Sequence, residues 1–342
     1  MNKGTLMNDT HISLAHGGGG ELTRLLLSER VIPKLSNPLL DPLGDSAVLP
    51  QPDGRVCMTT DAFVVQPLEF PGGDIGRLAV CGTVNDLAMA GARPTALSLA
   101  IVVEEGLEMS VFDRMIDSIA AAAGEAGVPI ATGDTKVVER GRGDGMIITT
   151  AGVGTLRDGV NLDAGRIVPG DVVIVTGLIA EHGLAVMSAR KGLAFETELL
   201  SDVAPLVGLA GDVFSSGADV KFMRDPTRGG VSGVLVDLAE QTKLSLDIDE
   251  RALPISAVAQ STADMLGLDP MTVANEGKAV IVVAEAEAEA ALRACRANPL
   301  GTKAAIVGKF TDATPPLVEL ITRPGGRRMV TRPYGEELPR IC

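Results

Sequence analysis

The most informative chemistry lies at the end of the chain, which finishes Pro-Arg-Ile-Cys and leaves the thiol of Cys342 with no residue after it. A cysteine in that place cannot close a long loop or fill a packed layer, but it can move and react. The segment before it is polar and contains Pro333 and Gly335, so it is predicted to form neither a docked helix nor a central strand. At full extension residues 332–342 would reach on the order of 35 Å. We interpret them as a mobile arm that carries sulfur into a site; the alternative is a frayed terminus that happens to stop at cysteine.

Carboxylates in the first half of the chain form a second group with chemical potential. They stand beside glycine or at the expected ends of strands, as Asp45, Asp61, Asp86 and Asp134. Side chains at such places pack poorly but converge easily on a hard cation at the open end of a sheet. Magnesium is the simplest such ion, and it would serve a polyphosphate whose charge it neutralises. Each aspartate taken singly is better interpreted as a turn or N-cap residue, but the recurrence of the pattern favours a metal site.

Two glycine-containing turns are candidates for holding phosphate. The run from Gly17 to Gly20, with His16 at its edge, offers bare backbone amides, although it lacks the spacing of a P-loop and fits a flexible linker equally well. The second turn leads from Asp225 into a helix predicted from Val231, and the amides at a helix N-terminus attract anions. The residues assigned to phosphate in these turns are His16, Gly18, Gly19, Thr227, Arg228 and Gly229.

One lysine and one glutamate are candidates for moving protons. Lys136 follows Asp134 by two residues, so both side chains project from one face of an extended strand. Such a lysine can hold a transferring phosphate or, if desolvated, carry a proton. Glu276 precedes a very apolar strand and is a candidate for a partly buried base. The alternative for both side chains is an ordinary surface ion pair.

Composition limits the class of protein. A chain of 342 residues is long for one core, and two domains are expected. The formal net charge of -14 opposes a nucleic-acid backbone, and an aromatic content of 2% gives few platforms for base stacking. The four cysteines form no C-x-x-C pair, which indicates reduced thiols and no zinc site. No apolar run approaches the roughly 20 residues needed to cross a bilayer, so we expect a cytoplasmic protein without a membrane partner.

Hydrophobic periodicity predicts two successive α+β units. We expect a flexible segment and first helix over 1–40, an N-terminal mixed α/β domain over 41–168, a C-terminal α+β domain over 169–331, and the mobile tail over 332–342. In the first unit the pattern predicts helices at 21–35, 75–90 and 109–126, and strands at 56–65, 96–103, 130–138 and 146–154. In the second it predicts helices near 181–190, 200–215, 231–241 and 286–297, strands at 172–175, 244–248, 279–283 and 305–310, and a hairpin over 318–330.

Longer motifs resemble a known family. Those at residues 44–47, 84–94, 133–136 and 226–230 resemble the ATP-using, PurM-like superfamily of aminoimidazole ribonucleotide synthetase and selenophosphate synthetase. With the motifs at 12–17, 181–183 and 275–277 and the terminal Pro-Arg-Ile-Cys, the chain resembles the HypE family of hydrogenase maturation factors over essentially its whole length. The resemblance implies a two-domain PurM-like architecture, with a homodimer in which the sheets of the first domains pair.

The resemblance also implies an activity and partners. It implies a carbamoyl dehydratase in which Cys342 receives a carbamoyl group from a HypF-type carbamoyltransferase. ATP would then drive its dehydration to thiocyanate, and a HypC–HypD complex would receive the cyanide for the iron of a nickel-iron hydrogenase. Its implied ligands of ATP and Mg²⁺ are Asp45, Asp61, Asp86 and Asp134, with Asn85 as a further nucleotide contact. Lys136 and Glu276 would orient the thiocarboxamide and move protons.

Two other functions remain open at this level. A selenophosphate synthetase shares the scaffold but usually needs a reactive cysteine or selenocysteine in its N-terminal glycine-rich loop, and residues 1–56 contain no cysteine. A non-catalytic thiol carrier, in which ATP only controls where the tail sits, would use the same terminal cysteine. Production of phosphate together with loss of one water from the loaded tail would separate a catalyst from such a carrier.

Overall fold

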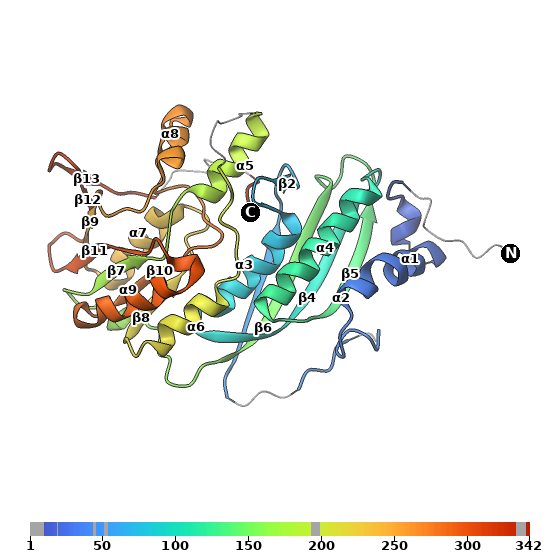
Figure 1. The fold of residues 1–342 in the computed structure, drawn as a ribbon, viewed down its shortest axis with the longest axis horizontal. Helices are drawn as coiled ribbons and strands as arrows, with labels where there is room; N and C mark the ends of the chain where they lie inside the picture. Colours follow the sequence, from blue (N-terminus) through green and yellow to red (C-terminus); the bar gives the residue numbers. More distant parts are fainter. Residues whose placement is uncertain (1–9, 19, 44–45, 51–53, 193–198, 333–339) are drawn as a thin grey trace.

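The computed structural model describes residues 10–18, 20–43, 46–50, 54–192, 199–332 and 340–342. Within them the chain forms two units that follow one another in sequence and lie side by side (Figure 1). The first sheet uses strands between Val56 and Leu156, and the second uses strands between Val172 and Met329. Gly19, Asp45 and residues 333–339 of the tail lie outside the described residues.

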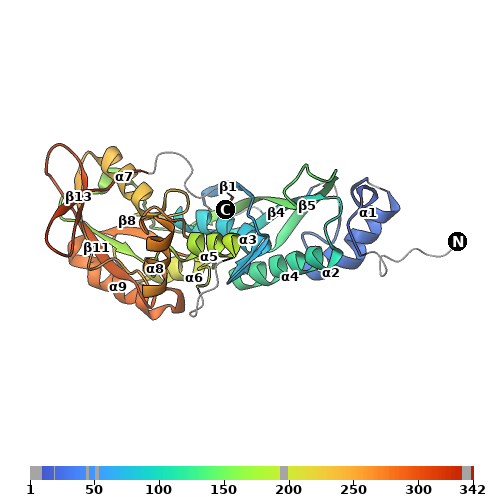
Figure 2. The same ribbon diagram turned by 90° about the horizontal axis from the view of Figure 1, so that it is seen from above.

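The first unit is a four-stranded sheet with helices on one face. Its strand order is β1 (Val56–Phe63), β6 (Met146–Leu156), β4 (Ala92–Glu104) and β5 (Ile130–Val138), and only the β4–β5 pair is parallel. The helices α3 (Ile75–Met89) and α4 (Met109–Ala126) lie together along one side of this sheet (Figure 2). β1 and β5 are therefore the two edge strands, and the second face carries no helix among the described residues.

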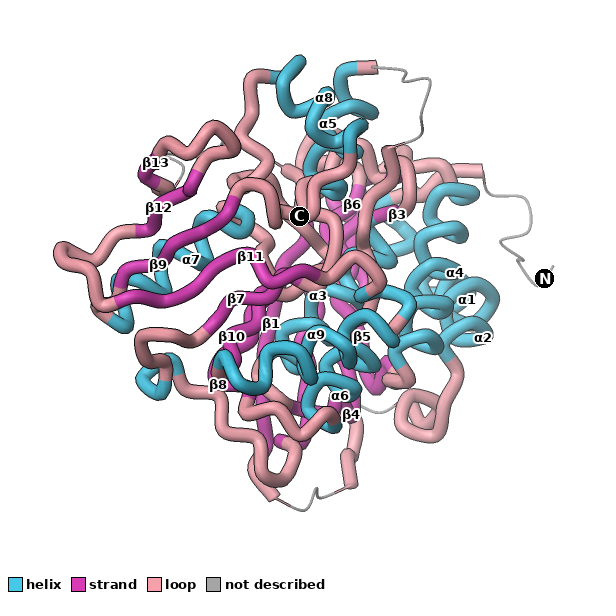
Figure 3. The backbone as a smooth tube through the Cα atoms, turned by 60° about the vertical axis from the view of Figure 1, so that its left-hand side comes forward, coloured by secondary structure: helices cyan, strands magenta, loops and turns pink. Residues whose placement is uncertain are grey.

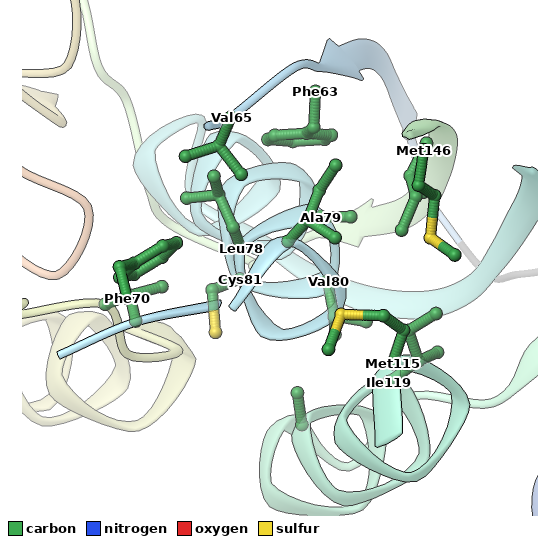
Figure 4. Packing of buried hydrophobic residues seen from close by; sticks show 14 of the residues in the cluster. Phe63, Val65, Phe70, Leu78, Ala79, Val80, Cys81, Met115, Ile119 and Met146 are labelled. Carbon is green, nitrogen blue, oxygen red and sulfur yellow. The ribbon is translucent and has the colours of Figure 1, made fainter. Parts of the chain in front are cut away.

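The core of this unit is built without tryptophan. Buried side chains of α3 such as Leu78 and Val80 lie between Phe63 and Phe70 on one side and Met115 and Ile119 of α4 on the other, as Figure 4 shows. α3 is buried nearly all round, because it lies between the sheet and the second unit and contacts α6 and β8 there. Its sequence accordingly lacks a polar face, which is what burial on all sides requires.

The N-terminal segment forms the single helical stretch that periodicity predicts over 21–35. It consists of α1 (Glu21–Leu26), a π-helical turn (Leu27–Val31) and α2 (Ile32–Leu35), preceded by a 3₁₀ turn at Leu14–Gly17. The 3₁₀ turn packs on β5 so closely that a Cβ on Gly17 would stand 2.5 Å from the backbone nitrogen of Val137. The segment is thus fixed to the edge strand β5.

The second unit is a seven-stranded mixed sheet covered on both faces. Its order is β13 (Arg327–Met329), β12 (Val318–Ile321), β9 (Ser245–Asp249), β11 (Ala305–Thr311), β7 (Val172–Val175), β10 (Val280–Val283) and β8 (Val220–Arg224). α7 (Gly230–Thr242) packs on one face, and α6 (Val207–Ser215) and α9 (Ala288–Ala297) pack on the other (Figure 3). The continuous apolar runs of β7 and β10 follow from burial on two faces.

The hydrophobic pattern fails to predict two elements of this unit, β8 and α8 (Ala257–Leu266). β8 carries Lys221 in its middle, yet the lysine is buried because its Nζ binds both carboxylate oxygens of Asp171 at 2.9 and 2.8 Å. α8 is rich in small and polar residues and packs on α5 (Glu181–Lys191). The predicted hairpin is confirmed as β12 and β13, and the predicted helix at 200–215 begins only at Val207.

The two units are joined by a buried amide. The side chain of Asn85, 1% exposed on α3, donates through Nδ2 to the carbonyls of Ala204 (3.0 Å) and Glu276 (3.2 Å). Its Oδ1 accepts from the backbone nitrogen of Leu206 at 2.7 Å. Donors and acceptor of this side chain are all directed at the second unit, so Asn85 holds α3 against it.

Replacing Asn85 by alanine is expected to destabilise the protein by about 1–3 kcal/mol, because three buried backbone groups lose their partner. The measurement is the free energy of unfolding by urea. Asn161→Ala, in which the lost side chain is exposed, is the matched control and should stay close to wild type. Equal stability of the two variants would contradict the joining role.

Candidate active site

The last three residues are docked between the two units. Backbone nitrogens of the segment after β1 donate to the tail, from Val64 to the carbonyl of Cys342 (3.4 Å) and from Gln66 to the carbonyl of Arg340 (3.2 Å). The side chain of Ile341, 4% exposed, belongs to a buried apolar cluster that contains residues of both units. The two hydrogen bonds are two residues apart on each segment, as between antiparallel strands. This pairing places Cys342 at the end of the tail that lies between the two units.

α5 holds the same residues from the second unit. His182 is fully buried, and its Nε2 lies 2.6 Å from the carbonyl of Ile341 while its Nδ1 lies 2.8 Å from Oγ of Ser201. Burial lowers the pKa of His182, so the ring is neutral at physiological pH and donates from Nε2. Arg190 adds a hydrogen bond of 2.6 Å to the carbonyl of Arg340. The tail is therefore held chiefly through its backbone.

This docked arrangement bears on the expected mobility of the tail. The sequence predicts a mobile arm that enters a site. The structure describes residues 340–342 in the inserted arrangement, whereas residues 333–339 lie outside the described part. Movement of the arm stays a prediction.

The thiol of Cys342 faces a small cavity of about 50 Å³ at the junction of the two units. Six of the residues assigned from sequence line it, together with one further carboxylate. The lining residues are Asp61, Ala62, Phe63, Gly82, Asp86, Asp225, Thr227, Arg228, Glu276 and Cys342. The structure thus brings sulfur, carboxylates and a guanidinium to one place.

Asp61 and Asp86 enter this cavity from the helix-covered side of the first sheet. Thr59 and Asp61 share one face of β1, and Oγ1 of Thr59 donates to Asp86 on α3 at 2.7 Å. Burial, followed by the charge of Asp86 and a hydrogen bond with it, raises the pKa of Asp61 to about 6, and Arg228 partly offsets this. The two carboxyl groups therefore compete for a proton or a cation.

Two more carboxyl groups face the same space. Enclosure by protein atoms and the nearby charge of Asp86 raise the pKa of Asp225 to about 7. Glu276 is 2% exposed, and burial together with the charges of Asp225 and its neighbours raises its pKa well above the ordinary value. Oε1 of Glu276 is buried without a hydrogen-bond partner among the described residues. Burial therefore favours the neutral form of Glu276, which can give a proton or, after losing it, take one back.

This donor set fits magnesium bound together with phosphate. Carboxylates with raised pKa values are hard oxygen ligands that a divalent cation would neutralise. Within the described part of the chain, no three His, Cys, Asp or Glu side chains are arranged so that they could hold a metal ion by themselves. Mg²⁺ typically takes one or two carboxylates and completes its shell with water and substrate phosphates. Asp61, Asp86 and Asp225 are the residues placed to supply those carboxylates.

The expected anion site at the N-terminus of α7 needs correction. The backbone nitrogen of Gly230 donates to Thr227 (2.9 Å), and that of Ser232 donates to Met271 (2.8 Å). These amides already have partners inside the protein and do not await an anion. Gly229 serves as the N-cap, with φ of 81°, a conformation that glycine adopts readily. The side chains of Thr227 and Arg228 line the cavity, and the assignment of Gly229 to phosphate stays a prediction.

Asp134 and Lys136 lie elsewhere in the chain, which corrects the expectation that the aspartates converge. They pair with Ala100 and Val102 of β4, whereas Leu99 and Ile101 face the helices, so Asp134 and Lys136 project from the open face. Asp61 projects from the opposite face of the other edge strand, roughly 14 Å away across three strand spacings. Lys136 Nζ stands 3.5 Å from Asp134 Oδ2, with both side chains 64% exposed. Within one chain, Asp134 and Lys136 therefore do not reach the cavity that Asp61 lines.

His16, Gly18 and Asn85 also differ from expectation. His16 is buried, and its Nδ1 accepts from the backbone nitrogen of Ser13 at 3.0 Å, which shapes the 3₁₀ turn beside β5. Gly18 ends that turn. The amide of Asn85 is committed to the joint between the units, so its assignment to nucleotide is corrected to a structural role. Gly19 and Asp45 lie outside the described residues, and their assignments stay predictions.

Sequence reasoning gave no role to three residues that the structure places at or beside the cavity. Asp225 directly follows β8, and that strand was not recognised because Lys221 interrupts it. His182 stands in the Glu-His-Gly motif but was given no role. Lys278, also buried, places Nζ 3.3 Å from Asp202 behind Glu276. The position of Asp225 just after the end of a strand was the available signal for that residue. His182 and Lys278 could be recognised only from the tertiary structure.

No described helix is both long enough and apolar enough to pass through a bilayer.

Comparison with known proteins places the chain in a family. Residues 43–156 match the family model of the N-terminal domain of AIR synthase related proteins, and residues 168–317 match that of the C-terminal domain. A curated relative from Rhizobium leguminosarum bv. viciae, named carbamoyl dehydratase HypE, is 48% identical over 97% of this chain and 95% of its own length.

Solved structures agree with this placement. A hydrogenase maturation protein HypE in complex with ATP superposes with a TM-score of 0.93 at 40% identity, over 96% of this chain and 99% of that one. A chain of a HypE–HypF complex superposes with a TM-score of 0.79 at 43% identity, over 90% and 99% of the two chains. The predicted two-domain PurM-like fold is confirmed, and the chain belongs to the HypE family of carbamoyl dehydratases that act in hydrogenase maturation.

Proposed function

We propose that the protein dehydrates a carbamoyl group carried on Cys342, using ATP, and leaves thiocyanate on the sulfur as the source of a cyanide ligand for a nickel-iron hydrogenase. The observation that carries the proposal is the position of the Cys342 thiol in one cavity with Asp61, Asp225, Glu276 and Arg228. The ATP complex of the HypE relative supports a nucleotide as the second substrate.

The chemistry balances with groups of this kind. The thiocarboxamide oxygen attacks the terminal phosphorus of ATP and releases ADP. The oxygen then leaves as phosphate while the nitrogen gives up two protons, so that S–C(=O)NH₂ becomes S–C≡N. The net change is loss of one water from the tail and hydrolysis of one ATP. Each stage needs an anion-binding group for the phosphoryl oxygens and a group that accepts protons from nitrogen.

Residues of the cavity can meet these needs. Arg228, with Thr227 beside it, is placed to bind phosphoryl oxygens, because its guanidinium carries donors in a fixed fork. Glu276, once ionised, is a strong proton acceptor because of its burial, and it lines the cavity with the sulfur. Magnesium held by Asp61, Asp86 and Asp225 would supply neutralising charge to the phosphates. His182 and Arg190 hold the tail backbone so that the thiol points into the cavity.

Loss of the terminal thiol tests the proposal directly. Replacing Cys342 by serine is expected to abolish formation of the dehydrated tail, measured by mass spectrometry of the C-terminal peptide after incubation with carbamoyl phosphate, a HypF-type transferase and ATP. Wild type should first gain the carbamoyl group and then lose the mass of one water. Cys295→Ala, which alters a thiol buried in the other unit, is the control and should process its tail normally. Cyanide ligand formed at the normal rate without Cys342 would overturn the proposal.

Glu276→Gln separates catalysis from stability. Dehydration should fall by about 100-fold or more, because the proton acceptor is lost. The pKa of Glu276 is higher in the folded chain than the ordinary 4.5, so wild type loses stability as pH rises from there through the raised pKa. Glutamine cannot ionise, so the variant should gain stability relative to wild type as pH rises from 4.5 toward 8.

The measurements are urea unfolding of both proteins between pH 4 and 8 and single-turnover dehydration. Glu289→Gln, which changes an exposed glutamate of α9, is the control and should alter neither quantity. If the difference in stability between Glu276→Gln and wild type does not widen as pH rises, the claim that burial raises the pKa of Glu276 is wrong.

A homodimer would complete the site. The open face of the first sheet carries apolar side chains such as Met58, 70% exposed, as well as Asp134 and Lys136. We infer that a second copy covers this face, and that its β5 edge brings Asp134 and Lys136 toward the cavity of the first copy. This arrangement would reconcile their assignment to ATP with their distance from Asp61 within one chain.

Met58→Glu should convert the dimer to monomer and weaken ATP binding, because a charge would be buried in the interface. Size-exclusion chromatography with light scattering gives the mass, and calorimetry gives the affinity for ATP. Met265 on α8 is 67% exposed and lies outside the first sheet, so Met265→Glu is the matched control. A wild-type monomer that still binds ATP and dehydrates its tail would remove the need for a second copy.

Partners follow from the proposed chemistry. A HypF-type carbamoyltransferase would load Cys342, and the HypE–HypF complex of a relative supports this pairing. A HypC–HypD scaffold would receive the cyanide. Membership of the HypE family favours this function over selenophosphate synthesis.

A further inference from the structure

A second cavity, of about 580 Å³, lies at the other end of the joint between the two units. Arg93 and Arg157 of the first unit line one side of it. The other side is lined by residues between the end of α6 and the start of β8, namely Phe214, Ser215, Ala218, Asp219 and Val220. Its volume falls within the range of small-molecule sites. It shares no lining residue with the cavity around Cys342.

Arg157 is held in place but its charge is not matched. Its backbone nitrogen donates to Gly91 at 3.0 Å, and its guanidinium carbon stands 6.0 Å from the ring centroid of Phe214 on α6. A Cβ on Gly211 would lie 3.2 Å from Nη2 of Arg157, so the guanidinium packs directly on that helix. Nε of Arg157 is buried with no hydrogen-bond partner among the described residues. Burial and the charge of Arg93 lower the pKa of Arg157.

The acidic residues of the cavity do not neutralise this pair of arginines. Both carboxylate oxygens of Asp219 are bound by Arg166 at 2.6 Å. In the part of the chain that the structure describes, neither Arg93 nor Arg157 forms an ion pair, and Asp158 at the rim pairs with neither. Two guanidinium groups that face one cavity without a counter-ion are a receptor for an oxyanion.

We propose that this cavity binds a small molecule through a phosphate or carboxylate group placed between Arg93 and Arg157. The ring of Phe214 and the side chain of Val160 offer an apolar wall for the rest of the molecule. The two arginines belong to the first unit and Phe214 belongs to the second, so the bound molecule contacts both units and stabilises their present arrangement. The site does not depend on the proposed reaction at Cys342.

The test is calorimetric titration of the full-length protein with inorganic phosphate and, separately, with succinate, in the presence of saturating ADP and Mg²⁺ so that the nucleotide site is filled. Wild type is expected to bind at least one probe saturably and to show a rise in Tm with it. Arg157→Gln and Arg93→Gln should each lower the affinity on the order of tenfold or more, since each removes a charge-assisted hydrogen bond. Arg293→Gln, which removes an exposed arginine of α9, is the matched control for net charge and should bind like wild type.

The two probes distinguish the source of the oxyanion: binding of phosphate alone indicates a phosphorylated ligand, and binding of succinate alone indicates a carboxylate. Because Arg93 is exposed, its variant keeps the test valid if Arg157→Gln fails to fold. The proposal is overturned if wild type binds neither probe, or if Arg93→Gln binds both as tightly as wild type does. It is also overturned if the arginine variants change only the oligomeric mass, because an acid of a second copy would then be the occupant.

Discussion

The structure depends on the confinement of several carboxyl groups around one sulfur atom at a domain junction. Asp61, Asp225 and Glu276 all have raised pKa values because protein surrounds them and because they face one another, and Arg228 alone opposes this for Asp61. Ionising such buried, mutually repelling carboxyl groups is unfavourable, and a bound cation would make it favourable. The affinity that we propose for a metal–nucleotide complex would therefore originate in the same burial that lowers the stability of the folded chain.

Confinement requires that the two units keep a fixed relation. Asn85 satisfies three backbone groups across the joint, and Asp86, the next residue of α3, faces the cavity. The residue that holds the joint and the residue that supplies a carboxylate are thus neighbours on one buried helix. A change in the angle between the units would expose the cavity to water. The pKa values of its carboxyl groups would then fall toward their ordinary values.

The tail is bound at this cavity chiefly through its backbone. Among its described residues, backbone carbonyls are bound by Val64, Gln66, His182 and Arg190, and Ile341 is the buried apolar side chain. Backbone contacts of this kind position a chain without regard to what its terminal side chain carries. The thiol of Cys342 can accordingly present different attached groups to the same carboxylates.

The sequence by itself determined the family, the terminal thiol, the two α+β units and most of their elements, because hydrophobic period and turn residues are local properties. It also singled out Asp61, Asp86, Arg228 and Glu276, which the structure brings to one cavity. Only the tertiary structure decided that Asp134 and Lys136 leave the opposite face of the sheet, that Asn85 is a joint, and that Asp225 and His182 belong to the site. Which faces and strand edges meet depends on pairing between segments far apart in the chain, and the pKa of a carboxyl group depends on what that pairing buries beside it.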